Sequence, residues 1–132
     1  MVKSKEHPSL TMAAISDIPF KTTNTFESRL EESRRIREKF PGRVPVIVER
    51  GQRSLSVPQI DKQKFLVPGD LSVSQFIFVI RKRLNLPSEQ ALFLFIGNTL
   101  PTTGMLIREL HASYGDPDGF LYASYCGENV FG

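Results

Sequence analysis

The chain has 132 residues and a mass of 14.9 kDa, a size that accommodates one domain with a hydrophobic core. A single cysteine, Cys126, excludes an internal disulfide and is typical of a protein from a reducing compartment. The longest apolar run, residues 91–96, is far too short to cross a bilayer, and we expect no signal peptide.

The net charge of +3 is unevenly distributed along the chain. Residues 26–84 carry 13 basic and 7 acidic side chains, a balance of +6, whereas residues 85–132 carry 1 basic and 5 acidic ones, a balance of −4. A basic region on a nearly neutral protein favours acidic partners such as acidic peptides, anionic lipid or nucleic acid. A solvated face without any partner has the same composition.

The first 42 residues divide into an extension and a helical segment. Residues 1–24 show no steady periodicity, so we expect a flexible extension over residues 1–15, with Ile18 and Phe20 as candidate anchors to the domain. Asn24 followed by Glu27 has the spacing of a capping box, which predicts a helix that begins there and ends near residue 40. Four apolar side chains fall on one side of this helix, which predicts an apolar face: Phe26, Leu30, Ile36 and Phe40.

Two strands and a second helix follow. Arg43–Arg50 reads as a strand in which Pro45 is acceptable because it lies near the start. Residues 61–67 are expected to form a second strand, which a Pro-Gly-Asp turn ends. The sequence Ser72-x-x-Gln75 is a capping box for a helix that runs to about residue 84. The predicted buried stripe of this helix is Val73, Phe76, Ile77, Ile80 and Leu84.

The last part of the chain supplies two more strands. Residues 91–96 are continuously apolar, which predicts a strand covered on both faces, and Gly97-Asn98 predicts a turn after it. Residues 103–113 are expected to form a short helix and residues 120–126 a final strand. This order of elements is the α+β β-grasp arrangement of ubiquitin-like domains, here with an added N-terminal helical segment.

We therefore predict four parts: an extension (1–15), a helical segment (16–42), a β-grasp core (43–127) and a conjugation tail (128–132). The tail reads Glu-Asn-Val-Phe-Gly and ends in Gly132. Because glycine has no Cβ, such a tail fits a narrow channel and presents an unhindered carboxyl group for acyl transfer. This pattern is typical of a protein that serves as a covalent tag.

A family resemblance is carried by four segments: FESRLEESRRIREKFPGRVPVIVER, DKQKFLVPGDLSVSQFIFVIRKRL, ALFLFIGNTLP and FLYASYCGENVFG. Together they resemble the autophagy ubiquitin-like modifiers of the GABARAP type, over about residues 18–132 and almost without gaps. The chain departs from that pattern in its first 15 residues, which most members lack. It also has Asn24-Thr25-Phe26-Glu27 where the family usually reads His-Pro-Phe-Glu.

The resemblance implies a protein that is not an enzyme and that uses no cofactor or metal. It implies that a cysteine protease processes and delipidates the tail, and that activating and conjugating enzymes carry the protein as thioesters. Gly132 would finally be joined to the amine of phosphatidylethanolamine on the autophagosome membrane. The expected location is cytoplasmic, with an autophagosome-bound form when the protein is lipidated.

The resemblance also implies a groove for cargo receptors and adaptors that carry an aromatic-x-x-aliphatic motif. Lys62 and Lys64 fit an exposed edge strand, to which an extended peptide adds with successive side chains on opposite faces. The implied aromatic pocket comprises Glu32, Ile36, Pro45, Ile47, Lys64, Leu66 and Phe120. The implied aliphatic pocket comprises Phe65, Val67, Pro68, Leu71, Phe76 and Val79.

Two further surfaces belong to this expectation. Arg43, Lys62 and Arg83 are the expected contacts for acidic residues that flank the motif, each contributing ~0.2–1 kcal/mol. Residues 93–95 match a segment that serves as a second docking surface in some members of the family. Core packing remains the main expected role for at least two of those three residues.

An unconjugated adaptor for nucleic acid or for the cytoskeleton is the main alternative. Both versions rest on the basic residues Arg34, Arg35 and Arg37, and the nucleic-acid version also on Lys39 and on residues 81–83. Nucleic-acid binding usually requires exposed aromatic side chains among the charges, and here the aromatic residues follow the core periodicity. We therefore expect no nucleic-acid partner, and microtubules remain a candidate partner.

A catalytic role has little support from the sequence. Cys126 lies in a predicted strand, His7 in the extension and His111 in the predicted short helix. None of them has a second ligand or base at motif spacing, so neither a nucleophilic dyad nor a metal site is indicated.

Overall fold

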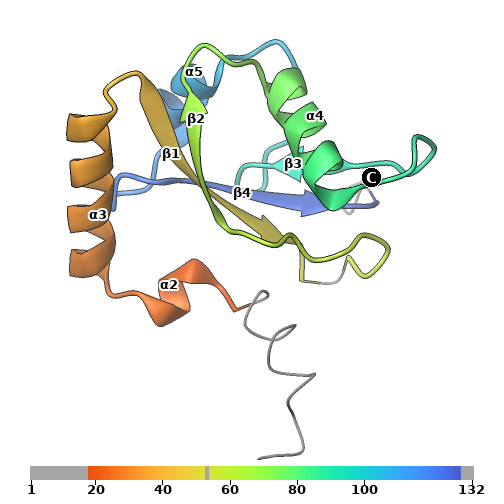
Figure 1. The fold of residues 1–132 in the computed structure, drawn as a ribbon, viewed down its shortest axis with the longest axis horizontal. Helices are drawn as coiled ribbons and strands as arrows, with labels where there is room; N and C mark the ends of the chain where they lie inside the picture. Colours follow the sequence, from red (N-terminus) through yellow and green to blue (C-terminus); the bar gives the residue numbers. More distant parts are fainter. Residues whose placement is uncertain (1–17, 53, 129–132) are drawn as a thin grey trace, which may run out of the picture.

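The computed structural model describes residues 18–52 and 54–128. Its four strands form one mixed sheet in the order β2-β1-β4-β3 (Figure 1). β1 (Arg43–Arg50) is antiparallel to β2 (Lys64–Pro68) and parallel to β4 (Leu121–Cys126). This topology confirms the predicted α+β β-grasp fold.

The short strand β3 (Phe93–Phe95) lies at the far edge of the sheet and pairs antiparallel with β4. The expectation of a longer strand over residues 91–96 is therefore wrong at both ends. Residues 94–96 are buried, whereas Ala91 is exposed. After the strand, Gly97 adopts a positive φ of 59°, and the turn is closed by the Thr99 N–H, which donates to the Ile96 carbonyl at 2.9 Å.

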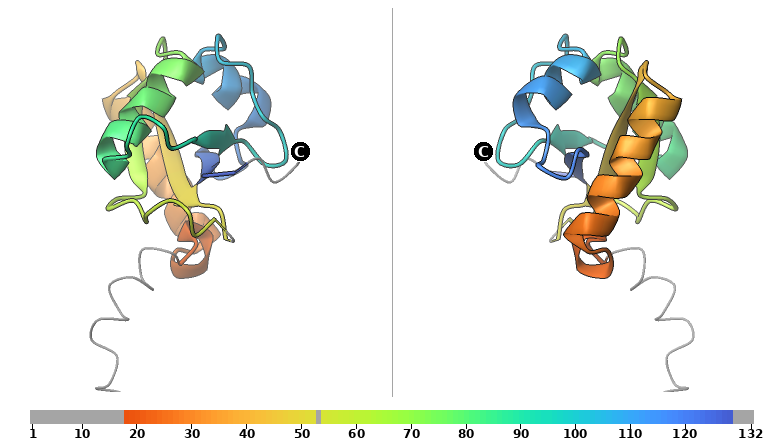
Figure 2. Two further views of the ribbon diagram at one scale, coloured as in Figure 1. Left: turned by 90° about the vertical axis from the view of Figure 1, so that its right-hand side faces the viewer. Right: turned by 90° about the vertical axis from the view of Figure 1, so that its left-hand side faces the viewer.

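The helices lie on the two faces of this sheet (Figures 1 and 2). One face carries α4 (Val73–Leu84) and α5 (Ile107–Tyr114), and the other carries α2 (Phe20–Thr23) and α3 (Phe26–Lys39). Alternate residues of the strands supply the two faces, as the pleat of a sheet requires. The larger apolar cluster lies under α4 and α5, and a small cluster of Phe20, Ile47 and Phe120 lies under α2 and α3.

The capping box at the start of α4 is confirmed. The Gln75 N–H donates to the Ser72 hydroxyl at 3.2 Å, and the Ser72 N–H donates to Gln75 Oε1 at 2.9 Å. Asn85 ends the helix in the left-handed conformation. The predicted stripe is also confirmed: Val73, Phe76, Ile80 and Leu84 are buried, and Ile77 packs against the same cluster.

The predicted cap of α3 is wrong by one residue. Thr25 is the N-cap, and its hydroxyl accepts the Ser28 N–H at 3.1 Å. Asn24 instead ends the additional helix α2, where its side-chain amide donates to the Phe20 carbonyl at 2.9 Å. The sequence pattern does not reveal α2, the single helical turn after Pro19. Because α2 is present, Asn24 ends that helix and does not begin α3.

The apolar face predicted for α3 is not the face that the helix turns toward the sheet. The residues that this helix buries are Arg29 and Ser33, whereas Phe26 and Leu30 are each 42% exposed and Phe40 is 40% exposed. Ile36 is the one member of the predicted face that is half-buried. The physical reason is Asp118, which is fully buried beneath the helix and accepts hydrogen bonds from Arg29 and Ser33. These bonds hold the polar side of α3 against the sheet.

The remaining boundaries differ from expectation by a few residues. β2 begins at Lys64 rather than at residue 61, and α5 spans Ile107–Tyr114 rather than residues 103–113. The predicted extension and Gly132 lie outside the described residues, and the four-part division of the chain stays a prediction. Within the described part of the chain, no helix combines the length and hydrophobicity needed to cross a bilayer.

Candidate functional site

Among residues 18–52 and 54–128, no strand lies beside the outer edge of β2, because β2 is the first strand of the sheet. The Val48 N–H donates to the Gln63 carbonyl at 2.8 Å, and the Gly69 N–H donates to the Gly42 carbonyl at 3.0 Å. This antiparallel register turns the N–H and C=O groups of Lys64 and Leu66 away from β1. An extended peptide can therefore pair with these groups at the free edge.

Pro45 lies within β1 without removing a backbone hydrogen bond between neighbouring strands. It lies opposite Leu66 in a pair whose backbone groups do not face each other. Its nitrogen therefore points toward β4, whose pairing with β1 begins one residue later, at Val46 and Leu121. The proline consequently occupies a position where no N–H is needed.

The predicted aromatic pocket lies on the α3 side of β2. Lys64 and Leu66 face their cross-strand partners Ile47 and Pro45 in pairs whose side chains lie close together. Ile47 and Phe120 are completely buried and form a floor, on which the Phe20 ring packs edge-on at 5.3 Å from the Phe120 ring. Sequence reasoning gave Phe20 an anchoring role and did not include it in the pocket.

An ion pair spans the gap between β2 and α3 above this floor. The Lys64 ammonium binds the Glu32 carboxylate and also lies 5.9 Å from the centre of the Phe20 ring. Beside this pair, α3 and the residue after it line a hollow of about 240 Å³: Glu32, Arg35, Ile36, Lys39 and Phe40. An aromatic side chain entering between α3 and β2 would therefore meet Lys64 and Glu32 at the entrance.

Most of the residues predicted for the aliphatic pocket lie on the opposite, α4 side of β2, whereas Pro68 ends the strand on the same face as Lys64 and Leu66. Phe65, Val67 and Phe76 are buried, and the Phe65 and Phe76 rings pack edge-on with centres 5.9 Å apart. Pro68 and Val79 are exposed, and Leu71 is half-buried against the core. The structure thus places the three buried residues as a floor on this side, with the half-buried Leu71 packed against the same cluster.

The three cations expected to meet acidic flanks lie at two places. Lys62 and Arg83 converge on the Phe65 ring, at 4.6 Å and 6.0 Å from its centre, and Arg83 pairs with Asp61 at 2.7 Å. Arg43 lies at the other end of β2, opposite Pro68, and donates to the Leu66 carbonyl at 3.1 Å.

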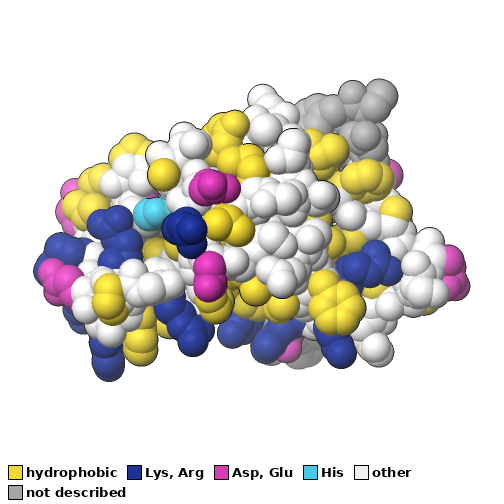
Figure 3. All heavy atoms as spheres, turned by 90° about the horizontal axis from the view of Figure 1, so that it is seen from above, with side chains coloured by type: hydrophobic (Ala, Val, Ile, Leu, Met, Phe, Trp, Pro, Cys, Tyr) yellow, Lys and Arg dark blue, Asp and Glu magenta, His cyan; other side chains and the backbone are white. Residues whose placement is uncertain are grey.

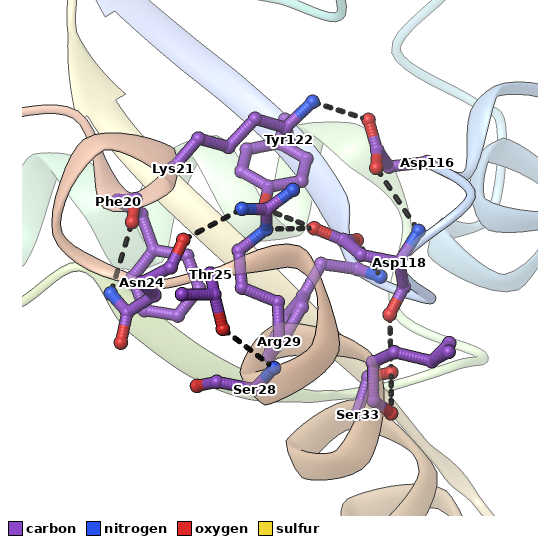
Figure 4. Close-up of polar contacts among 12 residues, drawn as sticks. Phe20, Lys21, Asn24, Thr25, Ser28, Arg29, Ser33, Asp116, Asp118 and Tyr122 are labelled. Carbon is purple, nitrogen blue, oxygen red and sulfur yellow. Dashed lines mark hydrogen bonds and ion pairs between the residues drawn. The ribbon is translucent and has the colours of Figure 1, made fainter.

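A buried polar network holds α3 against the sheet (Figure 4). Arg29 Nε donates to Asp118 Oδ2 at 2.8 Å, and the Tyr122 hydroxyl donates to the same oxygen at 2.5 Å. The Ser33 hydroxyl donates to the Asp118 carbonyl at 2.5 Å. Burial and the Asp118 carboxylate raise the pKa of Tyr122 well above its ordinary value, because both oppose a phenolate there.

Sequence reasoning missed this network. A usable signal was the spacing of Arg29 and Ser33, two polar residues four positions apart on a helix. A second signal was Gly119, which adopts a φ of 93° and on which a Cβ would collide with the Ser33 side chain. Neither signal identifies Asp118 as the shared partner.

Polar contacts also fix α2 in place. Lys21 pairs with Asp116 at 2.6 Å, and its ammonium lies 4.7 Å from the centre of the Tyr122 ring (Figure 4). The Phe20 N–H donates to a carboxylate oxygen of Glu49 at 2.7 Å. The aromatic pocket is therefore bounded on this side by a helical turn with its own attachments to the sheet.

The start of the predicted conjugation tail is held by a loop. The hydroxyls of Ser54 and Ser56 donate to Glu128 Oε1 at 2.7 and 2.9 Å, and the Gly127 N–H donates to the Ser54 hydroxyl at 2.7 Å. These hydrogen bonds lower the pKa of Glu128, because they stabilise its charged form. Gly132 itself lies outside the described residues.

The alternative sites gain little from the structure. Burial raises the pKa of the Cys126 thiol, and the His111 ring contacts the Gly119 carbonyl at 2.8 Å. Within residues 18–52 and 54–128, no cluster of His, Cys, Asp and Glu is arranged to hold a metal ion. On the outer face of α3, Arg34 pairs with Glu31 and Glu38 at 2.7 and 2.9 Å, so the charge of this one member of the basic run is balanced by neighbouring carboxylates.

A mixed β-grasp sheet with a crossing helix and two preceding helices defines a ubiquitin-like protein. A family model described as "Autophagy protein Atg8 ubiquitin like" matches residues 28–132, and the chain belongs to this family. It is therefore an autophagy ubiquitin-like protein. The recognition made from the sequence is confirmed at the level of the family, and the GABARAP type stays a prediction.

Curated relatives and a solved structure agree with this assignment. The chain is 54% identical to Autophagy-related protein 8a of Arabidopsis thaliana over 113 residues, which covers 86% of this chain and 92% of the relative. It is also 54% identical to Autophagy-related protein 8 of Kluyveromyces lactis, with coverage of 86% and 90%. The structure of Plasmodium falciparum Atg8 in complex with a Plasmodium falciparum Atg3 peptide matches with a TM-score of 0.78 and 38% identity, over 85% of this chain and 98% of that one.

Proposed function

We propose that this protein is a modifier that is joined through Gly132 to phosphatidylethanolamine on autophagosomal membranes. There it recruits cargo receptors and adaptors that carry aromatic-x-x-aliphatic motifs. The observation that carries the proposal is the free edge of β2, which lies between two apolar floors in a member of the Atg8 family. The protein acts as a substrate of conjugation and not as an enzyme.

The conjugation step rests on the tail. The family match extends to residue 132, which is a glycine, and a glycine has no Cβ to hinder acyl transfer at its carboxyl group. A conjugating enzyme would carry Gly132 as a thioester, and the amine of the lipid would attack the thioester carbonyl. An amide bond forms, and the enzyme's cysteine leaves as a thiol. The Plasmodium falciparum relative has been solved with an Atg3 peptide, which supports a conjugating enzyme as a partner of this chain too.

Peptide recruitment rests on the groove. The added strand would pair with Lys64 and Leu66, and its side chains would alternate between the α3 side and the α4 side of β2. Burial of about 200 Å² of an aromatic anchor contributes roughly 5 kcal/mol at ~25 cal/mol per Å². Ordering the peptide offsets much of this gain, so we expect micromolar affinity.

Localisation follows from the covalent state in this proposal. The unconjugated protein would be cytoplasmic, and the conjugated protein would be held at the autophagosome membrane by its lipid. A processing protease would return the protein from the membrane to the cytoplasm by cleaving after Gly132.

The test is mass spectrometry of the C-terminal peptide recovered from membranes of starved cells. We expect phosphatidylethanolamine on Gly132, and Gly132→Ala should abolish membrane attachment while peptide binding is unchanged. Conversely, Lys64→Ala combined with Leu66→Ala should weaken peptide binding and leave the lipid conjugate intact. An unmodified Gly132 in both fed and starved cells would contradict conjugation, and parallel loss of both activities in either variant would contradict separate sites.

A further inference from the structure

The residues that follow β4 are held by side chains of the loop that follows β1. The Ser54 hydroxyl accepts the Gly127 N–H and donates to Glu128 Oε1, both at 2.7 Å. The Ser56 hydroxyl donates to the same carboxylate oxygen at 2.9 Å. We call Ser54, Ser56, Gly127 and Glu128 together the tail clasp. Residues beyond the last strand of a domain usually fray unless they are tied down, so the clasp fixes a part of the chain that core packing leaves free.

The loop that carries the two serines is itself attached to β4 at two points. The Gly51 N–H donates to the Tyr125 carbonyl at 2.8 Å, and the Tyr125 hydroxyl donates to the Pro58 carbonyl at 2.7 Å. Between these two points, Ser54 is 1% exposed and Val57 is buried. The hydroxyl of Ser54 is therefore presented to the tail from a fixed support.

Gly127 lies in a narrow gap between this loop and a second one. A Cβ on Gly127 would collide with the Ser56 hydroxyl, and it would lie 3.0 Å from Val57 Cγ1 and 3.2 Å from Gln90 Nε2. A residue without a Cβ is therefore needed at this close approach. The second loop is also held, because the Arg81 guanidinium donates to the Gln90 carbonyl at 2.7 Å. Two fixed walls thus set the direction in which the tail leaves the domain.

The clasp serves neither the core nor the peptide groove. Ser56 and Glu128 are exposed, and hydrogen bonds between exposed groups add little net stability, because water offers the same bonds. The clasp follows β1 and β4, the inner strands of the sheet, whereas the groove uses the outer edge of β2. On the face seen in Figure 3, Lys and Arg side chains gather toward the α3 end and are sparse toward the other end. Within residues 18–52 and 54–128, hydroxyl groups rather than cations hold the Glu128 carboxylate.

We propose that the tail clasp orders the start of the tail for conjugation, so that Ser54 and Ser56 are positioning residues for the reaction at Gly132. The inference rests on the proposed conjugation through Gly132 and deepens it. Neither serine takes part in the chemistry, because both act only through the backbone of Gly127 and the carboxylate of Glu128.

The length of the tail explains why its starting point is important. Four residues follow Glu128, and a fully extended chain of four residues spans at most about 14 Å. The point at which Glu128 leaves the domain therefore limits where Gly132 can reach on an enzyme. An enzyme that receives Gly127 and Glu128 already ordered does not have to order them on binding. Ordering the backbone of a single residue changes a binding equilibrium by about fivefold to thirtyfold.

The experiment measures formation of the first thioester between the full chain and an activating enzyme supplied with ATP, over a range of concentrations of the chain. Ser54→Ala combined with Ser56→Ala removes both hydroxyls. We expect KM to rise about fivefold to tenfold while kcat stays within about twofold of the wild-type value, because the lost order is regained on binding and the reacting glycine is unchanged. Ser56→Thr keeps the hydroxyl and should leave KM within about twofold of wild type, whereas Ser56→Ala alone should give an intermediate KM.

Two measurements on the free protein show whether the clasp has opened. Hydrogen exchange at the Gly127 amide should be faster in the double variant, while the amides of β4 keep their protection. The hydroxyls of Ser54 and Ser56 lower the pKa of Glu128, so this pKa should rise toward the ordinary value of about 4.3 in the double variant. A nuclear magnetic resonance titration of the Glu128 side chain measures that change.

Ser72→Ala is the matched control, because it removes a serine hydroxyl that accepts a backbone N–H at the start of α4. Its KM should equal that of the wild-type protein. An unchanged or lower KM in the double variant, an unchanged exchange rate at Gly127, or an equal rise of KM in Ser72→Ala would each overturn the positioning role while conjugation through Gly132 stands. If the wild-type protein formed no thioester, the proposed conjugation would fail and the positioning role with it.

Discussion

The two faces of the sheet are covered in different ways. On the α4 and α5 side, a continuous apolar cluster extends from Val44 to Tyr125. On the α3 side, the apolar cluster consists of Phe20, Ile47 and Phe120, and the helix is fixed by buried polar contacts to Asp118. Apolar burial is large but non-directional, whereas a hydrogen-bonded ion pair is specific in geometry. The first face therefore supplies most of the stability, and the second sets the position of α3 beside the groove.

The largest effect should come from removing the centre of the polar network. Asp118→Ala leaves Arg29 with a nearly buried, unpaired charge, and it removes the acceptor of the Tyr122 hydroxyl. Breaking such a buried pair costs about 3–5 kcal/mol in the free energy of unfolding. Urea denaturation measures this cost, and hydrogen exchange should show the amides of α3 losing protection before those of α4. Asp61→Ala, which breaks an exposed pair with Arg83, should cost less than about 1 kcal/mol.

A cavity created by substitution in the larger apolar cluster, on the opposite face of the sheet, should destabilise the whole domain. Ile80 is completely buried in the larger cluster, so Ile80→Ala should cost about 2–5 kcal/mol in the free energy of unfolding. Because this cluster joins α4 and α5 to every strand, hydrogen exchange should accelerate in all elements together. If the amides of α4 alone lost protection from hydrogen exchange, this result would contradict the proposed difference between the two faces of the sheet.

A smaller loss of stability is expected from a substitution at the edge of the polar network around Asp118. Tyr122→Phe removes the hydroxyl that donates to Asp118 and should cost about 1.5–3 kcal/mol at neutral pH, since the acceptor is charged. The pKa of Tyr122 is raised in the folded state, so its contribution is complete below the ordinary tyrosine pKa of about 10. That contribution is lost as the pH rises from about 10 toward the folded-state pKa.

Denaturation of the wild-type protein and of Tyr122→Phe between pH 8 and about pH 11 tests the direction in which the Tyr122 contribution changes with pH. The wild-type free energy of unfolding should fall more steeply with rising pH than that of Tyr122→Phe, so the difference between them should shrink. A difference that stays constant or grows over this range would show that the Tyr122 proton is not held more tightly in the folded state.

The smallest effects should come from matched helix caps on the two faces. Thr25→Ala and Ser72→Ala each remove a hydroxyl that accepts a backbone N–H, and each should cost about 1 kcal/mol. The Ser72 change should lower the global free energy of unfolding, because α4 belongs to the main core. The Thr25 change should appear chiefly as faster exchange in the first turn of α3. Identical hydrogen-exchange patterns for the two variants would show that α3 does not open independently of the main core.

The features that the sequence predicted well depend on neighbouring residues. The capping box of Ser72 and Gln75 spans three positions, and the assignment of Lys64 and Leu66 to one face of β2 follows from the period of a strand. The rotation of α3 could not be predicted in this way. It depends on Asp118, which is 89 positions from Arg29, and the Arg43 contact with Leu66 requires a side chain to cross a neighbouring strand.

The most direct test of the central claim is a nuclear magnetic resonance titration of the isotope-labelled protein with a Trp-x-x-Leu peptide. The account predicts that the largest amide shifts occur at Lys64 and Leu66, which face the free edge of β2, with smaller changes in α3 and none at β3. The Lys64→Ala and Leu66→Ala double variant should show greatly reduced shifts. Largest shifts at β3 or at the exposed Phe78 of α4, with β2 unchanged, would contradict the account.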